Sequence, residues 1–374
     1  MNLVFVSNFY NHHQASLCNA LWQGAETFHF VQTAPMDPER QRLGWDMASF
    51  PPYVTADASV LDQADVVLAG SAPEALIRRA VLAGKPVLRY SERPLKNGAE
   101  PLKYLPRLVR WHHRNPTGKR VYLLCASAYA AADYAGFGLF RGRSYRWGYF
   151  PECRRYDDPD RLQAEKERRS LLWAGRFLDW KHPDDAVAVV RRLAAEGVDV
   201  RLQLTGTGPM ETALRELTQN EERITLTGPM RPEQVRRCME RSGVFLFTSD
   251  RQEGWGAVVN EAMNSGCAVV AGHAAGSVPY LLRDGENGLL YPSGDTQALY
   301  RRIRLLLDDP GLQQRLGSAA YRTVTWLWSP EEAARRLLLL AEHILAGEES
   351  PVLFEDGPCS PAPLLRDDWY RAKE

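Results

Sequence analysis

The sequence predicts an α/β protein with two doubly wound parallel-sheet domains that face each other across a cleft. Three observations lead to this fold class. Short apolar segments alternate with helical patterns along most of the 374 residues, as in the crossover units of a parallel sheet. This alternation stops once, in a charged stretch near the middle of the chain, and then resumes. Hydrophobic residues make up 45% of the chain, which allows each half to bury a core of its own.

The first series of strands and helices predicts an N-terminal Rossmann-like domain over residues 1–150. The apolar segment Asn2–Ser7 is typical of a short buried strand. Further expected strands are Thr27–Gln32, Asp65–Ala69, Pro86–Tyr90 and Val121–Ala126. Helical patterns fall near Ala15–Trp22, Pro73–Leu82 and Ser127–Ala135.

A second series predicts a C-terminal Rossmann-like domain over residues 151–328. Its expected strands read LLWAG, VRLQLTG, RITLTG, VFLFTS and CAVVAG. The charged stretch 151–168 lacks apolar periodicity, so we expect a linker there. Residues 329–374 are expected to form a closing helix and a proline-rich tail that returns toward the N-terminal domain.

Composition excludes several classes of protein. Lysine plus arginine and aspartate plus glutamate number 46 each, so the net charge identifies no partner. The six cysteines do not have metal-ligand spacing, and we expect them to be reduced, as in the cytoplasm. The chain opens with no signal-peptide pattern and contains no apolar run of the roughly 20 residues that span a bilayer. A soluble, cytoplasmic protein is therefore expected.

The strongest chemical signal follows the segment VFLFTS. Glu253 and Glu261 lie eight positions apart, the first in a loop and the second inside the next helix. Between them, Gly254, Trp255 and Gly256 leave backbone N–H groups free at the helix N-terminus, where the helix dipole favours a phosphate. A carboxylate before this turn can accept hydrogen bonds from sugar hydroxyls, and one inside the helix can bind a ribose diol.

Other loops that follow strands carry a second set of candidate residues. Arg176 and Lys181 lie in GRFLDWKHPDDAV, ahead of a helix expected near Pro183. Two fixed cations there can stabilise the charge of a departing diphosphate. Glycine turns at Gly206 and Gly208, and at Gly228 and Met230, can present backbone groups to a nucleobase, although such turns are also ordinary strand ends.

These motifs, together with GENGLLYPSGD, occur in one order over residues 170–295 that resembles the retaining GT-B glycosyltransferases of family four, known by their E-x7-E motif. The resemblance implies that Arg176 and Lys181 hold the diphosphate of a nucleotide-sugar donor. It implies that Glu253 holds the donor sugar and Glu261 the ribose. It places Met230 and Arg231 beside the base, either uracil or guanine.

The N-terminal domain departs from the family pattern. The loop Asn11–Gln14 follows the first strand in place of a glycine pair. The sequence Ser91-Glu92-Arg93 follows PVLRY, where the family often has a histidine or an aspartate. By position, Glu92, His12 and His13 are the acceptor-side candidates, and Glu92 and His13 are candidates for assisting the reaction.

We expect no cofactor and no metal. Asp158-Pro159-Asp160 matches the D-x-D pattern of metal-using transferases, but it lies in the expected linker and not after a strand. The protein's own cations would replace Mg²⁺ beside the leaving group. The expected reaction is a front-face substitution in which the leaving phosphate takes the acceptor's proton.

Three other functions share features with this pattern. A dinucleotide oxidoreductase is disfavoured because NFYNHHQ, and not G-x-G-x-x-G, follows the first strand. A nucleotide-sugar epimerase or hydrolase of the same fold is an alternative. A non-catalytic sugar-nucleotide-binding subunit is another, although all four motif side chains are present.

The segment 93–120 is strongly basic, because it contains eight lysines and arginines and one acidic residue, Glu100. Leucine, valine, tyrosine and tryptophan are interleaved with them, a pattern that suits an anionic membrane surface. A solvated face is the plain alternative, and nucleic acid is disfavoured beside a sugar-transfer site. We therefore expect peripheral attachment to the inner face of the membrane and a lipid-linked saccharide acceptor, as in bacterial surface-polysaccharide assembly.

Overall fold

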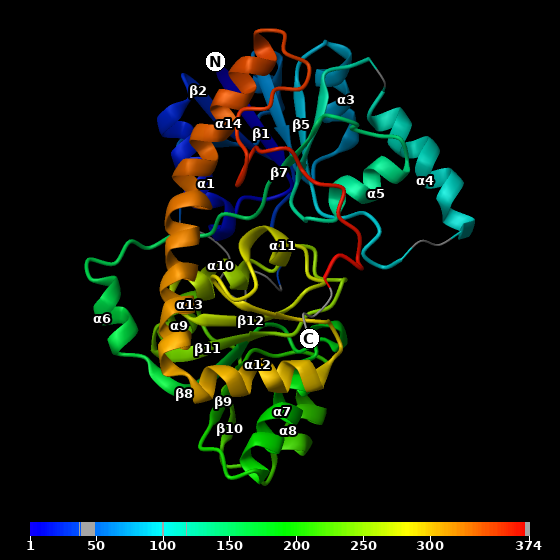
Figure 1. Cartoon of the computed structure of the whole chain (residues 1–374). Coiled ribbons are helices and arrows are strands. Elements are labelled where there is room, and N and C mark those ends of the chain that lie inside the picture. Colours follow the sequence, from blue (N-terminus) through cyan, green and yellow to red (C-terminus); the bar gives the residue numbers. More distant parts are fainter. Residues whose placement is uncertain (37, 39–48, 99–100, 117, 371–374) are drawn as a thin grey trace. The chain divides into compact units, whose positions relative to one another are not determined.

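In the computed structural model the chain divides into two units, each built on one parallel sheet (Figure 1). The structure describes residues 1–36, 38, 49–98, 101–116 and 118–370, without the side chains of 101–104. Unit 1 comprises Met1–Glu152 and Leu327–Arg366, and unit 2 comprises Cys153–Trp326 and Asp367–Glu374. The sequence predicted domain boundaries after residues 150 and 328.

Unit 1 contains a seven-stranded sheet of order β3-β2-β1-β4-β5-β6-β7, with every paired strand parallel. Its strands are β1 (Asn2–Ser7), β2 (Thr27–Gln32), β3 (Val54–Thr55), β4 (Val66–Ala69), β5 (Val87–Ser91), β6 (Val121–Cys125) and β7 (Ser144–Arg146). Its helices are α1 (His12–Gly24), η1 (Ala58–Asp62), α3 (Glu74–Leu82), α4 (Pro101–Arg114), α5 (Ala130–Gly136) and α14 (Pro330–Leu345).

The central strands of unit 1 are apolar throughout because helices cover both faces of a parallel sheet. In β1, for example, Leu3 to Val6 are all buried, and Leu3 pairs with Val66 of β4. The C-terminal helix α14 begins after Ser329, whose side chain caps Glu332 N. It packs along α1 within this unit. Beyond α14, Cys359 is fully buried, so the tail contributes to the core of unit 1.

Unit 2 contains a six-stranded parallel sheet of order β10-β9-β8-β11-β12-β13. Its strands are β8 (Glu167–Ala174), β9 (Arg201–Thr205), β10 (Ile224–Leu226), β11 (Ser242–Phe247), β12 (Ala268–Gly272) and β13 (Leu289–Tyr291). Its helices are α6 (Pro159–Ala164), η2 (Asp179–Lys181), α7 (Pro183–Ala195), α8 (Glu211–Thr218), α9 (Pro232–Arg241), α10 (Ala257–Asn264), α11 (Val278–Leu281), α12 (Thr296–Asp308) and α13 (Pro310–Arg322), and η3 (Thr323–Leu327) follows.

The prediction of an irregular linker over 151–168 was wrong for its second half. Asp158 accepts a hydrogen bond from Arg161 N at 2.9 Å and caps α6, and Pro159 occupies the first helical position. Lys166 is buried and donates to three carbonyl oxygens at the end of α9 and the start of β11. Six residues are too few to show a helical period, which is why the sequence pattern concealed α6.

The predicted fold class is confirmed, since each sheet is a doubly wound parallel sheet. The strand order reverses between β1 and β4 in unit 1 and between β8 and β11 in unit 2. Ligands of open parallel sheets bind at the carboxyl ends of the strands at such a switch point. Among the described residues, no helix is long and apolar enough to cross a membrane.

Candidate functional site

At the switch point of unit 2, an ion pair connects the two loops that carry the strongest sequence motifs, the loop after β8 and the loop after β11. Lys181 ends the short helix that follows β8, and its ammonium contacts a carboxylate oxygen of Glu253, in the loop that follows β11. The two side chains are only 14% and 12% exposed. Ser249 also donates to this carboxylate, at 3.3 Å. A partly buried cation and carboxylate therefore lie together where a parallel sheet binds its ligand.

Three further contacts hold these two loops together. Asp250 N donates to Trp180 O at 2.9 Å, and Thr248 Oγ1 donates to Lys181 O at 2.6 Å. His182, in the left-handed region at φ 46°, places Nε2 3.5 Å from Asp250 Oδ2. Sequence reasoning missed these contacts because their partners lie almost 70 positions apart and no motif spacing connects them.

The N-terminus of α10 lies directly beyond Glu253. Gly256 caps the helix at φ 89°, and a Cβ atom here would lie 2.4 Å from the Phe247 ring, so glycine is required. Trp255 is fully buried and donates to Asn260 Oδ1 at 2.9 Å, so its side chain anchors the loop and only its backbone can meet a ligand. Glu261 lies in the second turn of α10 and is half-buried.

The loops after β8, β9 and β10 pack against one another. A Cβ atom at Gly206 would lie 1.8 Å from Gly175 O, so this glycine permits close backbone packing. Gly206 N donates to Gly228 O at 2.9 Å, which joins the two glycine turns. Arg176 in the first of these loops is exposed.

The remaining predicted donor residues border the same loops. Gly208 follows Gly206 in the turn after β9 and is half-buried. Met230 is half-buried, with its sulfur 3.9 Å from that of Cys238, and Arg231 is the exposed N-cap of α9. Burial raises the pKa of Asp185, in the first turn of α7, while the charge of His182 lowers it.

The prediction that Asn11–Gln14 is a loop was wrong, because α1 begins at His12. Asn11 Oδ1 accepts a hydrogen bond from His13 N at 3.0 Å and caps the helix. The rings of His12 and His13 lie 3.9 Å apart between centroids. Both histidines therefore stand in the first turn of α1, directly after the end of β1.

Glu92 lies at the carboxyl end of β5 and is held from two sides. Tyr149 Oη donates to Glu92 Oε1 at 2.9 Å, and Lys96 Nζ donates to Glu92 Oε2 at 3.2 Å. Ser91, which was expected in the loop, belongs to β5. Burial raises the pKa of the neighbouring Tyr90 phenol well above its ordinary value, so Tyr90 stays neutral. Sequence position predicted Glu92 but neither of its partners.

A protein-family model matches the segment that contains the predicted donor-side residues. The model of the glycosyl transferases group 1 matches residues 155–323. The N-acetyl-alpha-D-glucosaminyl L-malate synthase of Bacillus anthracis is 28% identical over 184 residues, which are 47% of this chain and 47% of that protein. The alpha-D-kanosaminyltransferase of Streptomyces kanamyceticus is 29% identical over 199 residues, or 52% and 49% of the two chains. The chain thus spans about half the length of these curated relatives.

Solved structures align with nearly the whole chain, whereas the curated relatives match about half of it. Anabaena Alr3699/HepE in complex with UDP aligns with a TM-score of 0.68 at 15% identity, covering 91% of this chain and 100% of that one. Sucrose-phosphate synthase from Thermosynechococcus elongatus aligns with a TM-score of 0.65 at 17% identity, covering 93% and 100%. At these identities the likeness shows the fold alone. The protein therefore has the GT-B fold, and its residues 155–323 match the model of the glycosyl transferases group 1.

Proposed function

We propose that this protein is a retaining glycosyltransferase that moves a sugar from a nucleotide-diphosphate sugar to a saccharide acceptor. The ion pair of Lys181 and Glu253 at the switch point of unit 2 carries this proposal. A cation can pair with the diphosphate of the donor, and a carboxylate can accept hydrogen bonds from the hydroxyl groups of its sugar. One site can therefore bind both parts of the donor. The group 1 family match over these loops supports the same activity.

On the donor side, each predicted residue has a role that its position supports. Arg176 and Lys181 bind the diphosphate, and Glu253 accepts hydrogen bonds from the sugar. The backbone from Gly254 to Gly256 offers N–H groups at the N-terminus of α10, which no side chain caps in the described structure. Glu261 binds the ribose, and the loop at Met230 borders the base.

The reaction we propose is a front-face substitution without a metal or a cofactor. The bond between the anomeric carbon and the phosphate oxygen breaks, and the bond to the acceptor oxygen forms on the same face. The acceptor's proton passes to the departing phosphate oxygen. Lys181 and Arg176 stabilise the negative charge that develops there, which is the work that fixed cations do best.

A donor screen followed by product analysis tests this proposal. UDP-glucose, UDP-N-acetylglucosamine and GDP-mannose are first ranked by thermal shift, since a ligand of the folded state raises its melting temperature. The best donor is then incubated with a membrane-lipid extract, and the anomeric configuration of the product is read by NMR. An inverted linkage would contradict retention, and sugar release without transfer would favour a hydrolase.

Metal independence is tested with the same assay. Transfer should persist in excess EDTA, because side-chain cations supply the charge at the leaving group. Activity that EDTA abolishes and that Mg²⁺ or Mn²⁺ restores would show that a metal is needed.

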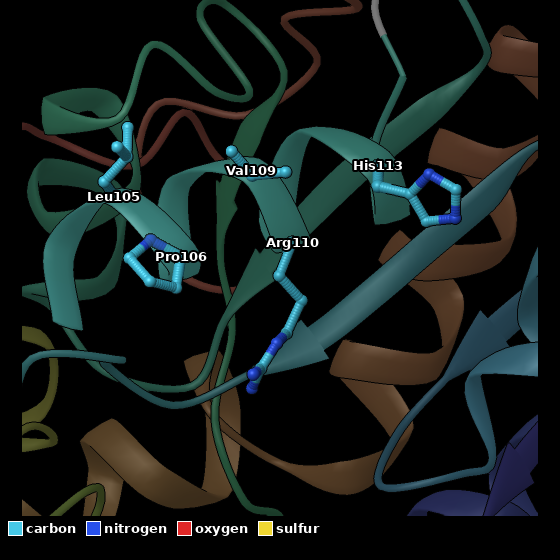
Figure 2. Close-up of a pocket in the computed structure, with 5 residues that line it drawn as sticks. All are labelled: Leu105, Pro106, Val109, Arg110 and His113. Atoms are coloured by element: carbon cyan, nitrogen blue, oxygen red, sulfur yellow. The ribbon is translucent and has the colours of Figure 1, made fainter.

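The lipid-linked acceptor and the peripheral membrane location are supported by the exposed face of α4. Leu105 and Val109 are 66% and 62% exposed. They line an open surface pocket with Pro106, Arg110 and His113, and all five residues come from this helix (Figure 2). Of the basic stretch 93–120, residues 99–100 and 117 and the side chains of 101–104 lie outside the described part.

The opposite face of α4 is anchored to unit 1. The Trp111 ring lies 4.4 Å from that of Phe137 and 5.4 Å from that of Tyr134, between centroids. Leu105 and Val109 therefore lie on the outward face of the helix, beside Arg110. Each such cation near an anionic bilayer contributes about 1 kcal/mol.

Vesicle co-sedimentation tests this location. The protein should pellet with phosphatidylglycerol-containing vesicles at low salt and detach as the salt concentration rises. Changing Arg107, Arg110 and Arg114 to Glu should abolish pelleting. The matched control changes Arg301, Arg315 and Arg322 of unit 2 to Glu, which alters the net charge equally and should leave pelleting intact. Equal binding to neutral vesicles, or none to either kind, would favour a soluble acceptor.

A further inference from the structure

Glu92 is held on both carboxylate oxygens and is still reachable from solvent. Tyr149 Oη donates to Oε1 at 2.9 Å and Lys96 Nζ donates to Oε2 at 3.2 Å. The Glu92 side chain is nevertheless 31% exposed. An ionised carboxylate has about four lone-pair positions. The two contacts therefore fix the direction of the group and leave positions for another donor.

The loop that carries Glu92 is itself fixed. Arg93 is 5% exposed and pairs with Asp133 at 3.1 Å, with its guanidinium 4.7 Å from the centre of the Tyr129 ring. Asp133 also accepts a hydrogen bond from Leu95 N, at 3.1 Å. These contacts join the end of β5 to α5. Glu92 is thus held at the edge of the sheet by a loop with buried supports on its far side.

The segment that carries Tyr149 is fixed as well. The half-buried Tyr90 donates from its hydroxyl to Gly148 O at 2.7 Å. The rings of Tyr90 and Tyr149 lie 5.7 Å apart between centroids. Tyr149 therefore reaches Glu92 from a backbone that is tied to the same strand, β5, that ends beside Glu92.

We propose that Tyr149 is a positioning residue for the acceptor. By holding Oε1, it directs the Glu92 carboxylate so that its open lone pairs accept a hydrogen bond from a hydroxyl of the acceptor next to the attacking one, while Lys96 fixes Oε2. Tyr149 acts through Glu92 and does not itself take the proton, which passes to the leaving phosphate. This inference deepens the proposed function and rests on it.

Removing one hydroxyl group tests the proposal. Tyr149→Phe keeps the ring but frees Oε1, so kcat/KM for the acceptor should fall about tenfold, as expected for the loss of a hydrogen bond to a charged group. The KM for the donor should stay within about twofold, because the donor-side residues are unchanged. The assay uses the donor selected by thermal shift and a graded membrane-lipid extract.

Two further variants separate positioning from a structural role. Glu92→Ala combined with Tyr149→Phe should transfer no more slowly than Glu92→Ala alone, since Tyr149 acts only through the carboxylate that Glu92→Ala already removes. Tyr145→Phe is the matched control. Tyr145 lies in β7, and its buried hydroxyl has no hydrogen-bond partner among the described residues. Its loss should leave transfer unchanged. Wild-type acceptor kinetics in Tyr149→Phe, or multiplied losses in the double variant, would overturn the proposal.

A second measurement does not depend on activity. In protein labelled with ¹³C at the glutamate carboxyl groups, the Glu92 resonance is assigned by its absence in Glu92→Gln. That resonance should shift in Tyr149→Phe and stay in place in Tyr145→Phe. An unmoved resonance in Tyr149→Phe would overturn the contact itself. Absence of transfer by the wild type would instead count against the proposed function.

Discussion

At the scale of single residues, the ammonium of Lys181 is paired with the Glu253 carboxylate, and a donor diphosphate has to compete with that carboxylate for it. We expect Lys181→Ala to lower kcat on the order of 10²–10³-fold, because this cation stabilises charge that develops only as the diphosphate leaves. Single-turnover kinetics with the selected donor measure this effect. Arg301→Ala, an exposed cation in α12 of unit 2, is the control and should behave as wild type. Normal turnover in Lys181→Ala would show that the diphosphate assignment is wrong.

The partner of Lys181 gives the opposite prediction for nucleotide binding. Glu253→Gln removes the negative charge beside the lysine, so UDP should bind about two- to tenfold more tightly. Sugar transfer should be lost, because the amide is a poorer acceptor for sugar hydroxyls. Calorimetric titration with UDP measures the first effect. Ser249→Ala, which removes a hydrogen bond to Glu253 but leaves the charge of the site unchanged, should leave UDP affinity nearly unchanged. Weaker UDP binding by Glu253→Gln would refute the competition.

Local patterns predicted Lys181, Arg176, Glu253 and Glu261, because each lies near a strand end and near recognisable glycines. Tyr149, Ser249 and the pairing of His182 with Asp250 were not predictable in this way. Their significance comes from tertiary contacts, such as that of Tyr149 with Glu92, 57 positions away. A contact between residues so far apart in the chain leaves no periodicity or motif spacing in a single sequence.

At the scale of elements, α10 depends on its cap. Gly256→Ala should lower the free energy of unfolding by about 2–4 kcal/mol, because the left-handed backbone disfavours a Cβ atom and the Phe247 ring must move. Gly136→Ala, in α5, is the matched control. A Cβ atom there meets no atom within 4 Å and the backbone is not left-handed, so stability should stay level or rise slightly. Thermal unfolding compares the two variants. Equal melting temperatures would contradict the steric argument.

The strands of four or more residues followed from apolar runs, as did the short β10, whereas the short strands β3, β7 and β13 and the 14-residue helix α4 did not. The strands β3 and β7 contain two and three residues, fewer than any periodic pattern can reveal. The start of α1 was placed three residues late, because Asn11 caps a first turn that contains two polar histidines. The residue at which a helix begins depends on one capping hydrogen bond, and hydrophobic periodicity does not reveal that bond.

At the scale of the whole molecule, the tail residues from the end of α14 to Arg366 belong to unit 1. Asp356 pairs with Arg146, and Pro361 forms a bridge with Tyr145 of β7. A chain shortened to Gly347 should lose about 3 kcal/mol or more in the stability of unit 1, because it loses buried Cys359 and these pairings. A chain shortened to Arg366 keeps them and is the control. Calorimetric scans compare the two, and equal unfolding of unit 1 would contradict this role.

The course of the backbone has a consequence for biosynthesis. The chain leaves unit 1 after Glu152 and re-enters it only at Leu327. Translation at about 5–20 residues per second needs on the order of 10–35 s to make the intervening segment. During that interval the nascent chain carries α1 without α14, the helix that packs along it. Unit 2, whose sheet is encoded within one continuous stretch, can form while the ribosome still holds the chain. The part of the protein that is synthesised first is therefore the part that finishes folding last.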